Sequence, residues 1–197
     1  MPRTKASGPS HDWDALFERA APQAGYFTLA DALEAGFSPP LLHYHSGSRV
    51  ERSGSRVERM GRGIYRLRHF PLHPDDELVP LWLWADKAGT FSQETALLLH
   101  GLSDALPARH HLTVPAAWRT RRLRVPPGMV LHFGDLMEGD VAWHGPVPVT
   151  SPSRTLQDCA AAHVQPDVLE AATRQAIARG LVGPAELDGT PTRGATP

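Results

Sequence analysis

Apolar side chains recur at helical spacing near the start of the chain. Over 12–21, one face carries apolar residues at positions i, i+3, i+4 and i+7, namely Trp13, Leu16, Phe17 and Ala20. This pattern predicts a first helix, which Pro22 and Gly25 would end. Residues 1–11 are polar and contain Pro and Gly, and they are predicted to be a disordered terminus.

Two further short helices are predicted directly after the first. Thr28 is a favourable N-cap for a helix over 28–35, and Ser38 is a favourable N-cap for a helix over 38–45. Pro39 takes the first helical position, where its missing amide costs nothing. Two short helices joined by a tight turn have the spacing of a helix-turn-helix.

The next segment contains a tandem repeat. Residues 46–52 and 53–59 are both SGSRVER. Two strand-like stretches, 57–60 and 64–67, then flank Gly-Arg-Gly and predict a hairpin with an arginine at its tip. We assign the first strand to the second copy, because that copy abuts the hairpin. The other copy is interpreted either as a tolerated loop insertion or as a source of extra DNA contacts.

The second half of the chain alternates helical and strand-like patterns. Pro71 and Pro74 mark a predicted domain boundary. Helices are expected over 75–88, 93–100, 152–163 and 166–179, and strands over 110–114, 129–133, 141–143 and 147–150. The predicted fold class is α+β: an N-terminal winged helix-turn-helix (12–70), a mixed α/β domain with a small sheet (75–187), and a disordered tail (188–197).

The charge of the whole chain, −1, conceals two basic blocks. Residues 41–70 hold seven Arg and two acids, and residues 109–124 hold five Arg and no acid. Such local asymmetry favours a nucleic-acid partner. Apolar residues at 41% indicate a globular protein, and no apolar run is long enough for a membrane span. The single cysteine and the lack of a signal-peptide pattern favour a cytoplasmic location.

The helix-turn-helix and the hairpin supply the candidate DNA-binding residues. A recognition helix reads base edges mainly with its N-terminal residues. The candidates around the two helices are Thr28, Ser38, Pro40, His43 and Tyr44. Arginines expected on phosphates or in the minor groove are Arg49, Arg52, Arg56, Arg59, Arg62 and Arg66.

A second basic surface is predicted in the other domain. Its members are Arg119, Arg121, Arg122 and Arg124. Three interpretations stay open: a solvated charge run, a second nucleic-acid contact, or a surface that faces an acidic partner.

Histidine is frequent, with eleven residues, but its spacing does not predict a metal site. The closest groupings are His43 with His45 and His110 with His111. Neighbours two apart on a helix point in different directions, and neither CxxC nor HExxH is present. No metal and no cofactor are predicted.

A catalytic site is not predicted either. Residues 92–104 contain Ser, Glu, His and Asp, but Ser92 is better explained as a helix cap, and Glu94 as a first-turn residue. Arg154 and Asp158 have the i, i+4 spacing of a helical ion pair, and Cys159 is interpreted as a small core residue. We therefore do not expect an enzyme.

Several stretches, in this order, resemble the AbiEi-family antitoxins. The winged-helix part is represented by GYFTLADALEAGFS (25–38) and RMGRGIYRL (59–67). The domain after it is represented by FSQETALLLHGLSD (91–104), HLTVP (111–115) and VTSPSRTLQD (149–158). The resemblance covers about 12–182, and the order of the motifs is more distinctive than any one of them.

The resemblance implies an antitoxin and transcriptional autorepressor of a bacterial type IV toxin–antitoxin, or abortive-infection, operon that serves phage defence. Its winged helix would bind double-stranded DNA at inverted repeats in its own promoter, as a homodimer or as cooperating monomers. Its C-terminal domain would counter a nucleotidyltransferase-like toxin without forming a stable complex.

Two other functions stay open on the residues alone. A winged-helix regulator with a ligand-sensing C-terminal domain would need an apolar pocket with convergent polar groups. A degenerate nucleic-acid-processing enzyme would need clustered acids with a lysine near a strand, and the only lysines, Lys5 and Lys87, are not in such a setting.

Overall fold

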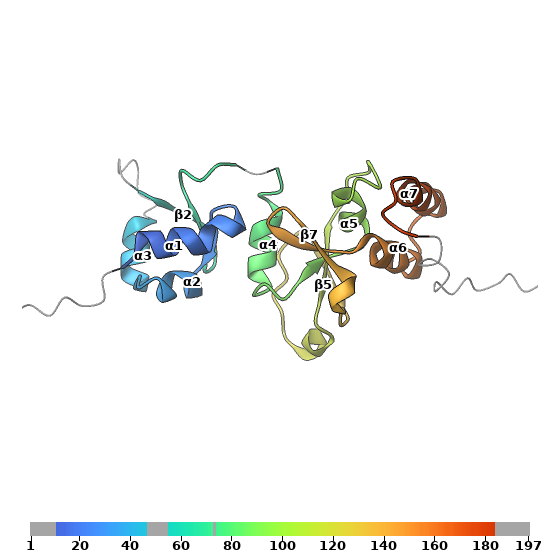
Figure 1. The fold of residues 1–197 in the computed structure, drawn as a ribbon. Coiled ribbons are helices and arrows are strands. Elements are labelled where there is room, and N and C mark those ends of the chain that lie inside the picture. The colour runs from blue at the N-terminus through green and yellow to red at the C-terminus, as the bar shows by residue number, and fades with distance from the viewer. Residues whose placement is uncertain (1–10, 47–54, 73, 184–197) are drawn as a thin grey trace, which may run out of the picture. The chain divides into compact units, whose positions relative to one another are not determined.

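The computed structural model describes residues 11–46, 55–72 and 74–183. The chain divides into two units, Met1–Lys87 and Ala88–Pro197, and each has helices and a sheet of its own (Figure 1). The predicted α+β class is confirmed. In the described part of the chain, no helix has the length and apolar character to cross a membrane.

The first unit combines short helices with a three-stranded antiparallel sheet. Its helices are α1 (Trp13–Ala20), the 3-10 turn η1 (Ala21–Gln23), α2 (Leu29–Glu34) and α3 (Pro39–His45). Its strands are β1 (Tyr26–Thr28), β2 (Val57–Gly61) and β3 (Ile64–Leu67), in the order β1-β3-β2. Strand β1 was not predicted, because three residues are too few to show an alternating pattern.

Side-chain caps fix where α2 and α3 begin. The Thr28 hydroxyl accepts a hydrogen bond from the amide of Asp31 at 3.1 Å, and the Asp31 carboxylate accepts one from the amide of Thr28 at 2.8 Å. Thr28 and Asp31 therefore form a capping box, and Thr28 is the N-cap as predicted. Ser38 caps α3 through the amide of Leu41, and Gly36, at φ +81°, makes the turn between the two helices.

The hairpin forms where the second SGSRVER copy meets Met60-Gly-Arg-Gly. Strand β2 begins at Val57, inside that copy, as expected. Val57 pairs with Leu67, and the register shifts between Arg59 and Gly61 to give a bulge near the tip. The Ser55 hydroxyl donates to the carbonyl of His45 at 2.6 Å, which joins the start of the hairpin to the end of α3.

An apolar core holds these elements together. Its largest fully buried side chains are Leu16, Phe27, Phe37, Leu42 and Val57. Burying each such side chain contributes about 1.5–3 kcal/mol. Trp13 packs edge-on against Phe37 with ring centroids 4.7 Å apart, so α1 is fixed to the turn before α3.

Helix α4 (Leu78–Trp84) belongs to the first unit. It is shorter than the predicted helix over 75–88, and it packs on β1 and β3. Two ion pairs bind its flanks to the same unit: Asp76 to Arg66 at 3.3 Å, and Lys87 to Asp31 at 3.1 Å. The boundary between the two units thus lies after α4, whereas Pro71 and Pro74 predicted a boundary before it.

The second unit is built on a mixed five-stranded sheet. Its strands are β4 (Thr90–Phe91), β5 (His110–Val114), β6 (Met129–Phe133), β7 (Val141–His144) and β8 (Val147–Thr150). The order is β6-β5-β4-β8-β7, with parallel pairing of β4 to β8 and of β5 to β6. Strand β4 has only two residues and was not predicted, while the other four strands lie where the pattern placed them.

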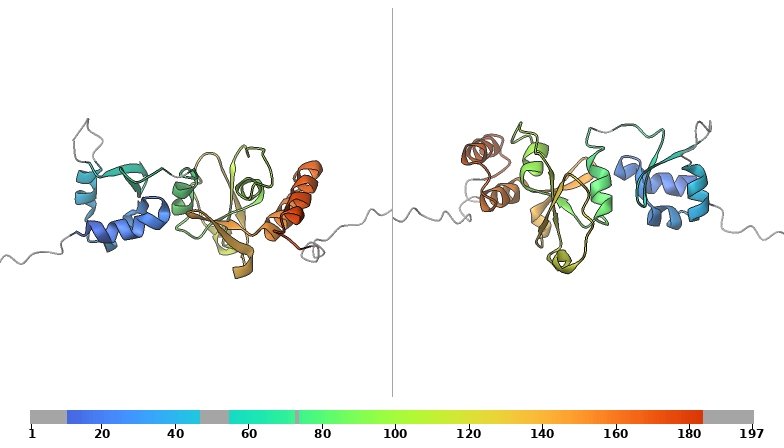
Figure 2. Two further views of the ribbon diagram at one scale, coloured as in Figure 1. Left: turned by 45° about the horizontal axis from the view of Figure 1, so that its top comes forward. Right: turned by 180° about the vertical axis from the view of Figure 1, so that it is seen from behind.

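Helices α5 (Gln93–Leu99), α6 (Pro152–Ala161) and α7 (Pro166–Ala178) complete this unit, with 3-10 turns η2 (Ala116–Thr120) and η3 (Glu138–Asp140). Helix α6 packs against both α5 and α7, and the two orange-red helices α6 and α7 lie next to one another (Figure 2). Their shared core includes Leu97, Leu156, Cys159 and Ala176. The position just before β4 needs a glycine. A Cβ at Gly89 would lie 2.6 Å from the Leu112 side chain.

Candidate functional site

Helix α3 presents the predicted base-reading residues on its solvent face. Ser38, Pro40 and His43 are exposed, and the Tyr44 side chain is 65% exposed. Leu42 is fully buried on the opposite face. All four candidates, in α3 and at its N-cap, are therefore accessible to solvent.

The Thr28 hydroxyl is already used in the cap of α2. Its hydroxyl donates to the Asp31 carboxylate at 2.8 Å and accepts from the amide of Asp31. Lys87 holds the other oxygen of that carboxylate at 3.1 Å. Burial raises the pKa of Asp31, but the hydrogen bonds from Thr28 and the charge of Lys87 outweigh burial and lower it.

Three of the predicted arginines extend from the hairpin segment into solvent. Arg56, Arg59 and Arg62 are all exposed. The Arg56 guanidinium lies 5.1 Å from the centre of the Trp13 ring, and Arg59 Nε donates to the carbonyl of Gly61 at 3.2 Å. Among the residues that the structure describes, no carboxylate forms an ion pair with any of the three. Arg49 and Arg52 lie outside the described residues.

Arg66, which the sequence placed among the exposed DNA contacts, is instead buried within the first unit. Arg66 is only 7% exposed, because it shares the inward face of β3 with Ile64. Its Nη2 donates to the carbonyls of Phe70 and Pro71, each at 3.1 Å, and pairs with Asp76. The spacing of Ile64 and Arg66, two residues apart in a strand, was the sequence signal for this inward orientation.

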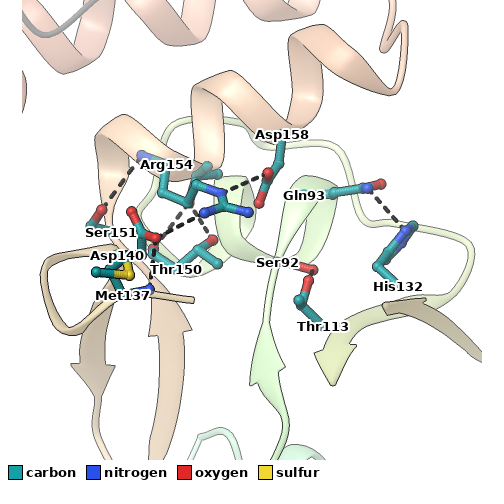
Figure 3. Close-up of polar contacts among 11 residues, drawn as sticks. Ser92, Gln93, Thr113, His132, Met137, Asp140, Thr150, Ser151, Arg154 and Asp158 are labelled. Carbon is teal, nitrogen blue, oxygen red and sulfur yellow. Dashed lines mark hydrogen bonds and ion pairs between the residues drawn. The ribbon is translucent and has the colours of Figure 1, made fainter. Parts of the chain in front are cut away.

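A polar network joins the start of α6 to η3 in the second unit (Figure 3). Arg154 binds Asp158 through Nε and Asp140 through Nη1, both at 2.8 Å. The predicted i, i+4 pair is confirmed, and Asp140 is an additional partner that sequence spacing could not show. Burial lowers the pKa of Arg154, but the two carboxylates outweigh burial and raise it. This network fixes the η3 segment to α6.

Ser92 does not cap α5 with its side chain, contrary to the prediction. Its buried hydroxyl accepts a hydrogen bond from the Thr113 hydroxyl at 2.8 Å, which ties the strand–helix turn to β5 (Figure 3). The following residue, Gln93, has φ +51° and places its amide between His111 and His132.

The two histidines beside Gln93 contact one another. His111 Nδ1 lies 3.0 Å from His132 Nε2, the ring centroids are 5.2 Å apart, and the ring planes are inclined by 19°. His111 Nε2 lies 3.4 Å from a carboxylate oxygen of Glu94. Burial is the main cause that lowers the pKa of both histidines. The sequence did not predict this pair, because β5 and β6 become neighbours only in the folded sheet.

One family profile matches this chain. It is described as the AbiEi antitoxin C-terminal domain, and it matches residues 87–189, which include the whole described part of the second unit. The chain belongs to the AbiEi antitoxin family. A search of the curated proteins found no match.

The AbiEi domain carries the second basic surface predicted from the sequence. Arg119, Arg121, Arg122 and Arg124 are all exposed. Arg119 Nη2 donates to the carbonyl of Phe133 at 3.3 Å, and the Arg121 guanidinium lies 4.5 Å from the centre of the Trp118 ring. The first two arginines are thus held against the domain by their contacts with Phe133 and Trp118.

Other motif residues of the AbiEi domain have structural roles. His100 Nε2 donates to the carbonyl of Thr150 at 2.7 Å, and Arg179 donates to the carbonyls of His100 and Gly101. Cys159 is buried, and burial, with the charges of Asp158 and Glu94, raises its pKa to about 12. Across the described ranges, no group of three or more His, Cys, Asp or Glu is arranged to hold a metal ion.

Proposed function

We propose that this AbiEi-family protein is a DNA-binding antitoxin that represses its own type IV operon and counters a nucleotidyltransferase-like toxin. The observation that carries the DNA-binding part is the joint exposure of the α3 surface and the hairpin arginines. Ser38, Pro40, His43 and Tyr44 face solvent, and Ser55 binds the end of α3 to the start of the hairpin. The helix–strand order α1-β1-α2-α3-β2-β3 supports its interpretation as a winged helix.

The electrostatics of the hairpin support a phosphate contact. Arg56, Arg59 and Arg62 lie on a short two-stranded segment, and no described carboxylate neutralises them. Exposed arginines that pair with no carboxylate can replace the counterions of a DNA backbone, which makes the affinity for DNA depend on the salt concentration. In this proposal α3 reads bases in the major groove, while the hairpin arginines contact the backbone or the minor groove.

Binding to the promoter tests this part of the proposal. The double variant Arg59→Ala/Arg62→Ala should bind the upstream inverted repeats more weakly and lower the slope of log affinity against log salt by about two. Arg174→Ala, which removes an exposed charge from α7, is the matched control and should leave the slope unchanged. An unaltered slope in the double variant, measured by fluorescence anisotropy from about 50 to about 200 mM salt, would contradict the hairpin contact.

The antitoxin part rests on the family and is tested separately. Co-expression of the chain with the toxin encoded beside it should relieve growth arrest. The Arg59→Ala/Arg62→Ala variant, expressed from a foreign promoter, should still relieve it, because neutralisation is proposed to belong to the AbiEi domain. Growth arrest that persists despite soluble, folded antitoxin would overturn this part.

Arg119, Arg121, Arg122 and Arg124 extend the proposal to the AbiEi domain. Their exposed positive charge suits a second contact with nucleic acid or with an acidic partner. The variant Arg122→Ala/Arg124→Ala distinguishes a nucleic-acid contact from a protein contact. If these arginines contact DNA, the variant will have a lower salt slope of promoter binding. If they contact an acidic protein, the variant will change only the neutralisation of the toxin.

A further inference from the structure

A pocket in the AbiEi domain combines apolar walls with one carboxylate. Its volume is about 180 Å³, and it lies among α5, the segment 103–108 and the start of α7. The apolar walls are Leu97, Leu106, Pro107, Val164 and Val168. Leu106 is 83% exposed, so it forms an apolar rim at the edge of the pocket.

Glu94 is the charged residue of the pocket lining. Its side chain is 48% exposed, and it comes from the first turn of α5. Its one ion-pair partner in the described residues is His111, at 3.4 Å. Burial is the main cause that lowers the pKa of His111, Glu94 opposes it, and Arg109 and His110 add to the lowering. Among the described residues, no Lys or Arg forms an ion pair with Glu94.

The charge of Glu94 also acts on the buried Cys159. Burial is the main cause that raises the pKa of the Cys159 thiol to about 12, and the charges of Asp158 and Glu94 add to it. Asp158 is already paired with Arg154, so Glu94 is the carboxylate whose charge is available to a ligand. A cation in the pocket would be attracted to a carboxylate that no described Lys or Arg already pairs with.

The size of the pocket limits its occupant. An apolar cavity of about 150 Å³ accommodates benzene, and pockets for drug-sized ligands begin at about 300 Å³. The pocket has room for a short stem of a few carbons with one polar head, but not for a nucleotide. The remaining polar lining, Ser103 and Gln165, can hydrogen-bond to such a head.

We propose that this pocket binds an alkyl cation, with its ammonium or guanidinium group on Glu94 and its stem against Leu97, Val164 and Val168. The chemistry fits two sources, a free small amine or the Lys or Arg side chain of a protein partner. This site is separate from the proposed DNA contacts, and its test does not depend on promoter binding.

Titration of the full chain with small probes tests the pocket directly. n-Butylguanidinium and n-butylammonium should shift the NMR resonances of Leu97 and Val168, and the neutral isostere n-butylurea should bind at least about tenfold more weakly. Glu94→Gln should lower the affinity for both cations at least about tenfold, since a hydrogen bond to a charged group contributes about 1.5–3 kcal/mol. Glu138→Gln, which removes an exposed carboxylate from η3, is the matched control.

A second variant keeps the test valid if Glu94→Gln disturbs the neighbouring histidines. Ala108→Leu adds bulk at an exposed position of the lining and leaves Glu94 in place. It should abolish binding of both cations while the thermal unfolding of the chain stays unchanged. Three results would overturn the proposal. These are equal affinity for n-butylurea and n-butylguanidinium, no binding of either cation to the wild type, and undiminished binding of the cations in both variants.

Co-expression distinguishes the two sources of the cation. If the natural occupant is a side chain of the toxin, Glu94→Gln and Ala108→Leu will both reduce relief of growth arrest while promoter binding is retained. If it is a free amine, relief of growth arrest will be unaffected by either variant. In both cases binding of the small probes is required, and its failure alone rejects the pocket whatever the outcome for the antitoxin function.

Discussion

At the residue scale, Arg66 shows how a basic residue of the hairpin can serve the fold. Its guanidinium lies against the Tyr26 ring at 5.3 Å, donates to two carbonyls and pairs with Asp76. The side chains of Arg66 and Asp76 are 8% and 18% exposed, so the pair is largely removed from solvent. Arg62, four residues earlier, is exposed and pairs with no carboxylate in the described part of the chain.

Arg66→Ala should therefore destabilise the first unit, whereas Arg62→Ala should not. Removing one partner of a buried ion pair costs about 3 kcal/mol, because the remaining Asp76 charge and the two carbonyls lose their partner. An exposed substitution such as Arg62→Ala stays within about 0.5 kcal/mol. Urea unfolding of both variants measures the difference, and equal stabilities would contradict the structural role of Arg66.

At the element scale, contacts between strands create the polar sites of the AbiEi domain. Strands β5 and β6 pair in parallel, and this register brings His111 and His132 to adjacent positions on one face, where Gln93 from α5 joins them. The charged groups around the pair are Glu94, Arg109 and Asp158, with His110 beside them.

The histidine pair should make the AbiEi domain less stable in acid. Burial lowers the pKa of His111 and of His132 in the folded state, so the unfolded chain binds more protons below its ordinary histidine pKa of about 6.5. The free energy of unfolding should be constant above about pH 7 and fall as the pH drops from about 6.5 to about 5.

Urea unfolding at several pH values checks this expectation. The double variant His111→Asn/His132→Asn should show a smaller decrease between about pH 7 and pH 5 than the wild type. His163→Asn replaces an exposed histidine after α6 and should retain the full decrease. The same acid sensitivity in the wild type and the double variant would assign the effect to other groups.

The repeated SGSRVER segment gives a second prediction at this scale. Deleting 46–52 places Ser53 directly after His45, where an identical sequence then leads into β2. We expect the shortened protein to keep its promoter affinity, because the described part of the hairpin begins at Ser55, inside the second copy, and the deletion leaves it intact. Gel shift with the upstream inverted repeats measures this, and loss of binding would show that the first copy contributes contacts.

At the scale of the whole molecule, the two units carry the two proposed activities. The division after Lys87 coincides with the start of the family match at residue 87. Helix α4 belongs to the first unit through Leu78, Val79 and Trp82, which are buried, and through the ion pairs of Asp76 and Lys87.

Fragments that end on either side of α4 test this division. A fragment 1–87 should unfold cooperatively in urea, whereas 1–74 lacks the helix that covers β1 and β3 and should be less stable by several kcal/mol, on the order of two or three buried apolar side chains. Circular dichroism and urea unfolding compare the two. If 1–74 were as stable as 1–87, the domain boundary indicated by the prolines would be the better one.

The sequence alone determined much of this protein, because caps, periodicity and turn residues act locally. Thr28 with Asp31, Ser38 with Pro39, and the glycines of the hairpin each act over a few residues, so the positions of α2, α3 and the hairpin follow from short stretches of sequence. The order of the motifs likewise determined the family, which the match over 87–189 confirms.

Only the tertiary structure decided which side chains meet across the sheets. The Arg66–Asp76 ion pair, the Asp140–Arg154 contact and the His111–His132 pair all join residues from separate segments. The pocket around Glu94 likewise needs α5, the segment 103–108 and α7 to come together. These features depend on strand order and helix packing, which local sequence does not encode: residues 21 positions apart, such as His111 and His132, become neighbours only when the sheet forms.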